Sequence, residues 1–290
     1  MINKLLFWLK VSRPGLWFAT VWLYMLPTGQ MDQVWTSIPF WIGLFYVTFP
    51  LNFLVYGWND MVDVETDKIN PRKDSFWFGA KGTEEQLVEL WKPILIVQLL
   101  IGPVLLYFVG WPMLWLLLTF VVINGLYNLP KNGLRSRPPL ELFCQVGYVM
   151  TALFSVYIND TQQLPWQTYL YLLLFAWQSH LIGEVMDIEP DRKAGRRTTA
   201  TILGMKKAKL FIIAIVAVEV MLLFFVFKTY IFGSMLLGGL VWLLLDLFFI
   251  YKTQKYSLEQ MKLFGMLSNV VAMVSMSYVW YTGCLLSVPS

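Results

Sequence analysis

The sequence predicts an all-α protein that crosses the membrane nine times, and three observations lead to this prediction. Hydrophobic residues make up 58% of the 290 residues and charged residues 14%, with a mean hydropathy of +0.59, whereas soluble domains are about half apolar and a quarter charged. The apolar residues form runs of about 18 to 24, the length a helix needs to cross about 30 Å of hydrocarbon. All 22 basic residues except Lys228 fall on one side of these runs, as expected for cytoplasmic loops.

The predicted spans follow one another through a single domain, 1–290. They lie at about 15–30, 38–59, 93–110, 112–128, 142–158, 168–187, 209–228, 231–251 and 263–286. The cytoplasmic side then carries the N-terminus and loops at about 60–92, 129–141, 187–208 and 252–262. No small-residue cleavage site follows the first run, so we expect a retained helix rather than a signal peptide. We expect a multi-pass protein of a prokaryotic plasma membrane.

The net charge and the cysteines give no indication of a nucleic-acid-binding protein or of a cysteine-based metal or redox site. The net charge of +4 is accounted for by the basic cytoplasmic loops and by a phosphate-bearing ligand, so no nucleic-acid partner is expected. Cys144 and Cys284 both fall inside apolar runs, without a C-x-x-C pattern, and are expected to serve packing alone.

A first acidic motif stands where the second span ends. Its oxygen-bearing side chains are Asn59, Asp60, Asp63 and Asp67. On a helix, Asn59, Asp63 and Asp67 share one face, with Asp60 beside them. Mg²⁺ prefers hard oxygen ligands and is typically held by one or two carboxylates together with substrate phosphates. The motif therefore predicts a metal–diphosphate site, and the same stripe continues inward through Tyr56 and Asn52, which could line the path of the substrate.

The loop from Asp60 to Glu89 is long for a compact protein, and such loops often form lids or binding elements. It carries Arg72 and Lys73 as candidate diphosphate ligands. The segment T-E-E-Q-L-V-E-L, 83–90, begins with a helix-capping pattern and predicts a short cytoplasmic helix.

A second acidic motif follows the sixth predicted span. It contains Asp187 and Asp191, then the basic residues Arg192, Lys193, Arg196 and Arg197. Pro190 lacks a donor and restricts the residue before it, so we expect the helix to end or kink near Ile188 and the two carboxylates to converge through loop geometry. Gly195 lets the chain turn, and the basic residues offer phosphate ligands. This arrangement repeats that of the first half and would bring two equivalent sites to one end of the bundle.

Three further polar residues fall inside or near the spans. His180, the single histidine, shares a face with Glu184 and Asp187 and is a candidate for orienting an acceptor or handling a proton, with hydrogen-bonded packing as the alternative. For Glu219 and Asp246 we expect a structural partner on a neighbouring helix rather than a proton-transfer role.

The two motifs, read N-D-x-x-D-x-x-x-D from Asn59 and D-I-E-x-D-R-x-x-G-x-x-T from Asp187, together with nine spans, resemble the UbiA superfamily of intramembrane prenyltransferases over nearly the whole chain. The resemblance implies an all-helical bundle with a central cavity open to lipid. It implies a prenyl diphosphate and a lipophilic acceptor as substrates and Mg²⁺ as cofactor, and it assigns the metal ligands to Asn59, Asp60, Asp63, Asp67, Asp187 and Asp191.

This chain departs from the family pattern after the fourth span. Tyr127 begins the segment Y-N-L-P-K-N-G-L-R, and Gly133 stands where many members have Arg. Lys131 or Arg135 must then supply the charge, or the charge is missing. The segments I-N-P-R-K-D and R-T-T-A-T-I-L-G make the chain look more similar to the carotenoid-type branch, the lycopene elongases.

The expected function is therefore Mg²⁺-dependent prenyl transfer to an isoprenoid, carotenoid or aromatic acceptor. The residues expected to carry the chemistry are Asp63, Asp187, Lys131, Arg135 and His180. Two alternatives stay open: an inactive lipid-binding relative, and an ion-coupled transporter. Transport predicts essential carboxylates near mid-membrane, whereas the dense clusters here lie at one edge.

Overall fold

The computed structural model of the protein describes residues 2–70, 72–130 and 133–289. Within these residues every regular element is a helix, and the one extended pairing is an isolated bridge between Ser75 and Gly79. The prediction of an all-α fold is confirmed.

The helices follow one another in chain order. They are α1 (Ile2–Val11), α2 (Trp17–Met25), α3 (Ile38–Val62), α4 (Val64–Ile69), α5 (Glu84–Val88), α6 (Trp91–Val109), α7 (Trp111–Asn128), α8 (Leu140–Phe143), α9 (Val146–Ile158), α10 (Trp166–Lys193), α11 (Thr199–Met221), α12 (Tyr230–Leu245) and α13 (Leu258–Thr282). Most of the helices are joined by short connections, and the longest loop lies between α4 and α5. π-Helical turns at Leu222–Val226 and Asp246–Ile250 extend α11 and α12.

Seven helical segments in the described part of the chain are long and apolar enough to cross a membrane, which makes this an integral membrane protein. They run over 38–62, 84–109, 111–128, 140–158, 199–226, 230–250 and 258–282. The two other predicted spans are helical but differ in character. Residues 15–30 hold α2, which has only nine residues, with a 3₁₀ turn on either side. Residues 168–187 lie within α10, which has 28 residues but is less apolar. The count of nine spans stays a prediction.

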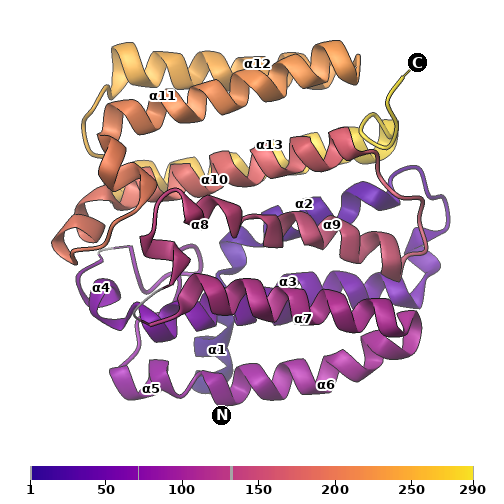
Figure 1. Cartoon of the computed structure of the whole chain (residues 1–290), viewed down its shortest axis with the longest axis horizontal. Coiled ribbons are helices and arrows are strands. Elements are labelled where there is room, and N and C mark those ends of the chain that lie inside the picture. Colours follow the sequence, from indigo (N-terminus) through magenta and orange to yellow (C-terminus); the bar gives the residue numbers. More distant parts are fainter. Residues whose placement is uncertain (1, 71, 131–132, 290) are drawn as a thin grey trace.

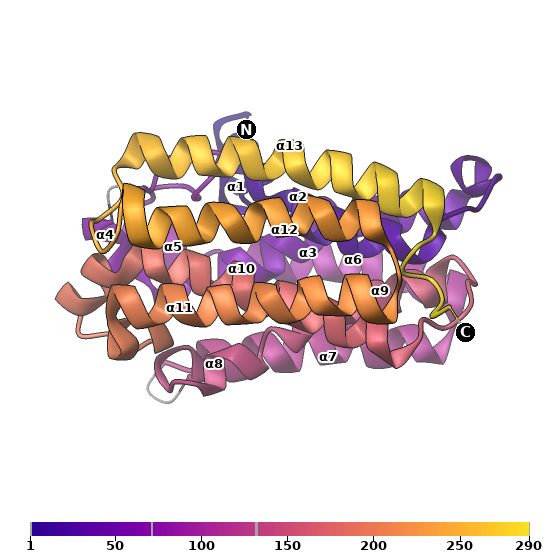
Figure 2. The ribbon, with the colours of Figure 1, turned by 90° about the horizontal axis from the view of Figure 1, so that it is seen from above.

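The long helices lie side by side, and the short helices gather at one end of the bundle. Figure 1 shows α4, α5 and α8 together at the end where α10 meets α11, and the view from above in Figure 2 agrees. The opposite end carries the C-terminus (Figure 1). We call the end with α4, α5 and α8 the charged end, because the two acidic motifs, at the α3–α4 junction and near the end of α10, meet there.

The outer surface of the bundle is apolar, as a lipid-facing surface must be. On α6, Leu99, Leu100 and Tyr107 are 63%, 71% and 84% exposed. The inner faces form apolar clusters, including one where α3 packs against α6 and α7 and another where α10 packs along α11. The long helices therefore present lipid-facing side chains outward and pack a core between them.

Side-chain caps define where several helices begin. Ser and Thr hydroxyls accept the backbone N–H two or three residues into the helix, which satisfies donors that would otherwise be unpaired. Full capping boxes occur at Thr83 with Gln86, Thr198 with Thr201, and Ser257 with Gln260. The short helix predicted from the Thr83 pattern is confirmed as α5.

Of the two alternatives expected at Pro190, an end or a kink of the helix near Ile188, the end is wrong. Pro190 lies inside α10, which continues to Lys193. Proline removes only its own N–H donor, and its carbonyl still accepts from Ala194 N at 3.0 Å. Packing of α10 along α11 compensates for the lost hydrogen bond, so the helix passes through the proline.

The end of α10 is fixed by the turn after it. Gly195 has a left-handed backbone (φ 69°), its N–H donates to Arg192 O at 3.1 Å, and Arg196 N donates to Asp191 O at 2.8 Å. These two bonds form a Schellman motif, for which glycine is the favoured residue. Asp187 and Asp191 consequently lie one turn apart on a single helix instead of converging through a loop.

Candidate functional site

The first acidic motif lies at the junction of α3 and α4. Helix α3 ends at Val62, and Asp63 separates it from α4. Helical spacing nevertheless continues, since Asp63 N donates to Asn59 O at 2.9 Å and Asp67 N to Asp63 O at 2.8 Å. The side chains also interact, with Asn59 Nδ2 donating to Asp63 Oδ2 at 2.9 Å. The junction thus presents the motif as one stripe.

Asp60 lies beneath this stripe and is completely buried. Its Oδ1 accepts from Arg13 Nη2 and from Lys73 Nζ, both at 2.7 Å. Lys73 also pairs with Asp67 Oδ2 at 2.7 Å. Asp60 Oδ2 is buried without a hydrogen-bond partner among the described residues. Two cations and one unused carboxylate oxygen therefore meet at the base of the motif.

Gly79 closes this part of the site. Its backbone has φ +98°, and an added Cβ would lie 3.1 Å from Arg13 Nε and 3.4 Å from Asp60 Oδ2. Only glycine adopts this backbone angle readily. The loop can thus approach the buried carboxylate closely without covering it with a side chain.

The second acidic motif lies on α10 and faces the first. Arg72 pairs with Asp187, and Asn70 Nδ2 donates to the same carboxylate at 3.4 Å. Asp191 is buried. The long loop that follows α4 thus reaches from the first motif to the second.

Arg196 joins the two motifs directly. Its Nη1 lies 3.1 Å from Asp63 Oδ2 and 3.8 Å from Asp191 Oδ1. Arg135, in the 3₁₀ turn Leu134–Ser136, contacts the other oxygen of Asp63. Of the two residues expected to replace the missing family arginine, Arg135 therefore lies at the acidic motif, whereas Lys131 is outside the described residues.

Aromatic side chains line the inner side of the charged groups. The Arg13 guanidinium carbon lies 4.4 Å from the centre of the Tyr56 ring, close enough for a cation–π interaction. The Tyr56 hydroxyl lies 3.2 Å from the Tyr148 hydroxyl. Tyr127 meets His180 edge to face, with ring centres 6.2 Å apart. The predicted residues Tyr56 and Tyr127 are thus near the charged groups, one turn deeper.

Three other predicted site residues lie apart from the carboxylates. Asn52 is buried, and its amide nitrogen donates to Thr20 Oγ1 at 2.9 Å, so it joins α3 to α2. Arg192 is exposed and contacts Thr201 O at 3.4 Å, and Lys193 is exposed. Because α10 continues past Pro190, Arg192 and Lys193 are rotated about 100° and 200° around the helix from Asp191 and point away from the site.

Burial governs the protonation of two carboxylates at the charged end. Burial raises the pKa of Asp191 to about 7, with Asp187 and Asp63 adding to the effect and Arg196 opposing it. Burial likewise raises the pKa of Asp67 to about 6, opposed by Lys73. The positive charges near each carboxylate are too few to offset the cost of its burial. An additional cation beside them would favour their ionised forms.

The donor set suits Mg²⁺. Its members are carboxylate and amide oxygens, the hard ligands this ion prefers, and Asp60 Oδ2 has no other use. Within the described part of the chain, no group of three or more His, Cys, Asp and Glu side chains lies close enough to hold an ion by itself. A metal bound here would therefore need phosphate oxygens to complete its coordination.

Arg13 is the basic site residue that sequence reasoning missed. It stands directly before Pro14 at the start of the first predicted span, where it was counted as a topology charge. One feature of the sequence could have identified Arg13 as a site residue: it is basic, it borders an apolar run, and it is predicted on the same side of the membrane as both acidic motifs. Its partner Asp60 lies 47 positions away, so only the tertiary structure identifies the pair.

The buried acidic residues of the spans differ from each other. Asp246 pairs with Lys209 at 2.6 Å, which confirms the structural partner expected for it. Glu219 is completely buried, and neither carboxylate oxygen has a hydrogen-bond partner among the described residues. For Glu219 the expected partner is thus not found.

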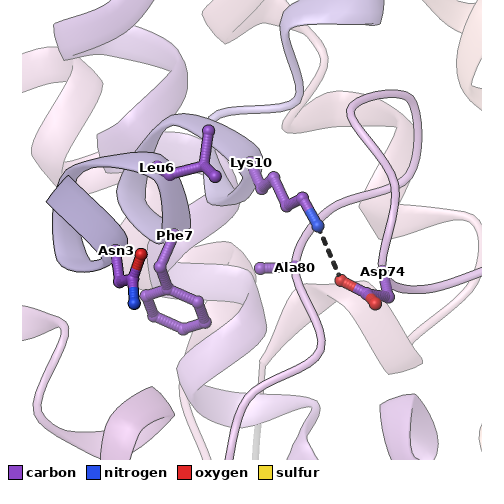
Figure 3. A pocket seen from close by; sticks show the side chains of 6 residues that line it. All are labelled: Asn3, Leu6, Phe7, Lys10, Asp74 and Ala80. Atoms are coloured by element: carbon purple, nitrogen blue, oxygen red, sulfur yellow. Dashed lines mark hydrogen bonds and ion pairs between the residues drawn. The ribbon is translucent and has the colours of Figure 1, made fainter.

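A small pocket on the outer side of the loop is separate from this site. Figure 3 shows Lys10 of α1 reaching Asp74, 3.0 Å away. The cavity measures about 180 Å³ and is lined by Asn3, Leu6, Phe7, Lys10, Asp74 and Ala80. Of the described residues that line it, none belongs to either acidic motif. The pocket lies where α1 contacts the loop.

Comparison with known proteins finds relatives that cover most of the chain. The lycopene elongase/hydratase of Corynebacterium glutamicum is 28% identical over 221 residues, covering 72% of this chain and 73% of that protein. The protein with the same description from Halobacterium salinarum is 28% identical over 208 residues, covering 72% of each chain. These relatives agree with the resemblance to the carotenoid-type branch.

Solved structures show the same fold. A UbiA homolog from Archaeoglobus fulgidus bound to GPP and Mg²⁺ matches with a TM-score of 0.66 at 17% identity, covering 93% of this chain and 99% of that one. The same homolog bound to DMAPP and Mg²⁺ matches with a TM-score of 0.65 at 14% identity, with the same coverage. Residues 16–270 match the UbiA prenyltransferase family. The chain therefore belongs to this family and is an integral-membrane prenyltransferase.

Proposed function

We propose that this protein catalyses Mg²⁺-dependent transfer of a prenyl group from a prenyl diphosphate to a lipophilic acceptor inside the membrane. One observation carries the proposal: basic side chains from four separate segments pair with the carboxylates of both acidic motifs at the charged end. They are Arg13, Arg72, Lys73, Arg135 and Arg196. A metal–diphosphate needs both signs of charge, carboxylates for the cation and basic groups for the phosphates.

The residues divide into two groups by charge. The carboxylates of both motifs, with the Asn59 amide, would hold the metal: Asp60, Asp63, Asp67, Asp187 and Asp191. When bound, Mg²⁺ would stabilise the negative charge of the departing diphosphate. The arginines and lysines that now neutralise the carboxylates would turn to the phosphate oxygens and stabilise the same charge.

The aromatic side chains below the charged groups suit the second half of the reaction. Departure of the diphosphate leaves an allylic cation, and aromatic faces attract cations. Tyr56 already holds a guanidinium over its ring. We infer that Tyr56, Tyr127 and Tyr148 shield the cation from water until the acceptor attacks.

A carotenoid is the acceptor class that we propose. Support comes from the relatives described as lycopene elongase/hydratase, while the homologous structures hold GPP and DMAPP. Lycopene and dimethylallyl diphosphate are therefore the first substrate pair to test. An aromatic acceptor is the second.

The proposal is tested in membranes that contain the protein, supplied with lycopene and radiolabelled dimethylallyl, geranyl or geranylgeranyl diphosphate. We expect label to enter a lipid-extractable product, to stop doing so with EDTA and to resume with added Mg²⁺. The variants Asp63→Ala and Asp187→Ala should lose this activity, whereas Lys193→Ala, at an exposed position of the same helix end, should keep it. Label that remains diphosphate under all conditions, with folded protein, would instead favour an inactive lipid-binding relative or a transporter.

A further inference from the structure

His180 extends the line of acidic residues toward the membrane interior. His180, Glu184, Asp187 and Asp191 occupy successive turns on one face of α10. At 1.5 Å per residue, His180 lies about 10 Å along the helix from Asp187. A donor whose diphosphate lies at Asp187 would direct its prenyl group toward this depth. His180 is therefore close to where the new bond would form.

Glu184 is fixed in place by the next helix. Its Oε2 accepts from Ala200 N at 2.9 Å, in the first turn of α11, where the helix dipole favours a negative charge. Glu141 Oε1 accepts the neighbouring Thr199 N at 2.8 Å. Glu184 is 7% exposed, and these contacts leave its Oε1 facing the imidazole.

Glu184 Oε1 lies 3.2 Å from His180 Nε2. Within the described part of the chain, neither atom has a hydrogen-bond partner, so the two groups lie in close contact without an aligned N–H···O bond. In the tautomer with hydrogen on Nε2, the lone pair resides on Nδ1. A carboxylate this close stabilises the imidazolium that forms when Nδ1 takes a proton. The pair is therefore placed to accept a proton.

Prenyl transfer to an alkene requires a proton to leave. The bond from prenyl C1 to the diphosphate oxygen breaks, and the diphosphate leaves with the electron pair. The π electrons of the acceptor double bond form the new carbon–carbon bond to C1, and the second alkene carbon becomes cationic. Loss of a proton from an adjacent carbon returns an electron pair and restores a double bond. If water adds to the cation instead and releases a proton to solvent, an alcohol forms.

We propose that His180, positioned by Glu184, takes this proton at Nδ1 and so decides that the product is an alkene rather than an alcohol. The inference rests on the proposed prenyl transfer to an alkene acceptor. His180 is the catalytic residue in this step, and Glu184 is a positioning residue that acts through it.

The test measures the ratio of alcohol to alkene product rather than the rate. Membranes containing the wild-type protein or the variants His180→Gln, His180→Asn and Glu184→Gln are given lycopene, dimethylallyl diphosphate and Mg²⁺ in water enriched in ¹⁸O. Mass spectrometry counts prenylated alkene and ¹⁸O-labelled alcohol. Ser179→Ala is the matched control, because Ser179 is the exposed neighbour of His180 on the same helix and bonds only to Phe175 O in its own helix. Melting in detergent verifies that each variant is folded.

We expect both His180 variants to raise the alcohol-to-alkene ratio at least tenfold, Glu184→Gln to raise it less, and Ser179→Ala to leave it unchanged. A His180 variant that makes product in the wild-type ratio overturns the inference, as does a wild-type protein that makes only alcohol. Two His180 variants are used so that misfolding of one leaves the other to decide. If the folded wild-type protein transfers no prenyl group, the proposed function is contradicted, and this inference is contradicted with it.

Discussion

Arg196 offers the sharpest test of how the two acidic motifs cooperate. Its Nη1 atom lies 3.1 Å from Asp63 Oδ2 and 3.8 Å from Asp191 Oδ1, so one guanidinium serves both motifs. The variant Arg196→Gln keeps much of the side-chain volume and removes the charge. We expect it to weaken binding of the diphosphate and stabilisation of its charge as it departs.

The size of the effect follows from the geometry. Two unit charges 3.1 Å apart attract by about 5 kcal/mol at an effective dielectric constant of about 20. Desolvation offsets much of this attraction, and hydrogen bonds to charged groups contribute about 1.5–3 kcal/mol net. If Arg196 transfers such a bond to the diphosphate, its loss lowers kcat/KM about 10- to 150-fold. Arg196→Lys should recover part of the loss, because lysine keeps the charge without the planar fork.

The assay is the initial rate of prenyl transfer in membranes over a range of donor concentrations, normalised to folded protein. Lys193→Gln is the matched control, since it removes a positive charge from the same helix end at an exposed position. It should change kcat/KM less than about threefold, because an exposed charge contributes little. Equal activities of Arg196→Gln and Lys193→Gln would refute the reasoning.

Three further predictions concern the base of the site and the bundle. Arg13→Gln removes one of the two cations on Asp60 and should lower kcat/KM about tenfold; an unchanged value would separate Arg13 from the site. Gly79→Ala removes no charge, but its backbone angle and the 3.1 Å approach of the new Cβ to Arg13 should raise the KM for the diphosphate, and wild-type kinetics would show that the loop adapts freely. Asp246→Ala leaves Lys209 buried without its partner and should lower the free energy of unfolding by about 3–5 kcal/mol in a detergent denaturation titration. The double replacement Lys209→Met with Asp246→Leu should recover most of that stability, and no recovery would contradict the ion-pair explanation.

Much of the fold could be predicted from the sequence, because the patterns that indicate helices depend on residues close together in the chain. Apolar runs long enough to cross a membrane and the capping pattern at Thr83 depend on neighbouring residues, and the structure contains the corresponding helices. The helix end expected at Pro190 was wrong because it, too, was predicted from a local preference alone. The local preference of Pro190 to end a helix was outweighed by packing along α11, which involves residues farther along the chain.

The pairing of charges could not be predicted, because it depends on tertiary contacts. Spacing alone left Lys131 and Arg135 as alternatives, and only the 3₁₀ turn places Arg135 against Asp63. The expected end of the helix near Ile188 also left the direction of Arg192 open. In the observed helix Arg192 turns away from the carboxylates, and Arg196, beyond the Gly195 turn, reaches back to them.

The most direct measurement is a double-mutant cycle on Mg²⁺-dependent binding of an unreactive thiolo analogue of dimethylallyl diphosphate. Affinity is measured for the wild-type protein, Asp63→Asn, Asp187→Asn and the double variant, each with Mg²⁺ and with EDTA. We predict that each single change weakens binding in Mg²⁺ and that the two effects fall short of adding by at least about 1 kcal/mol, as for residues that share a ligand. Additive effects, or an affinity that EDTA leaves unchanged, would contradict a shared metal–diphosphate site.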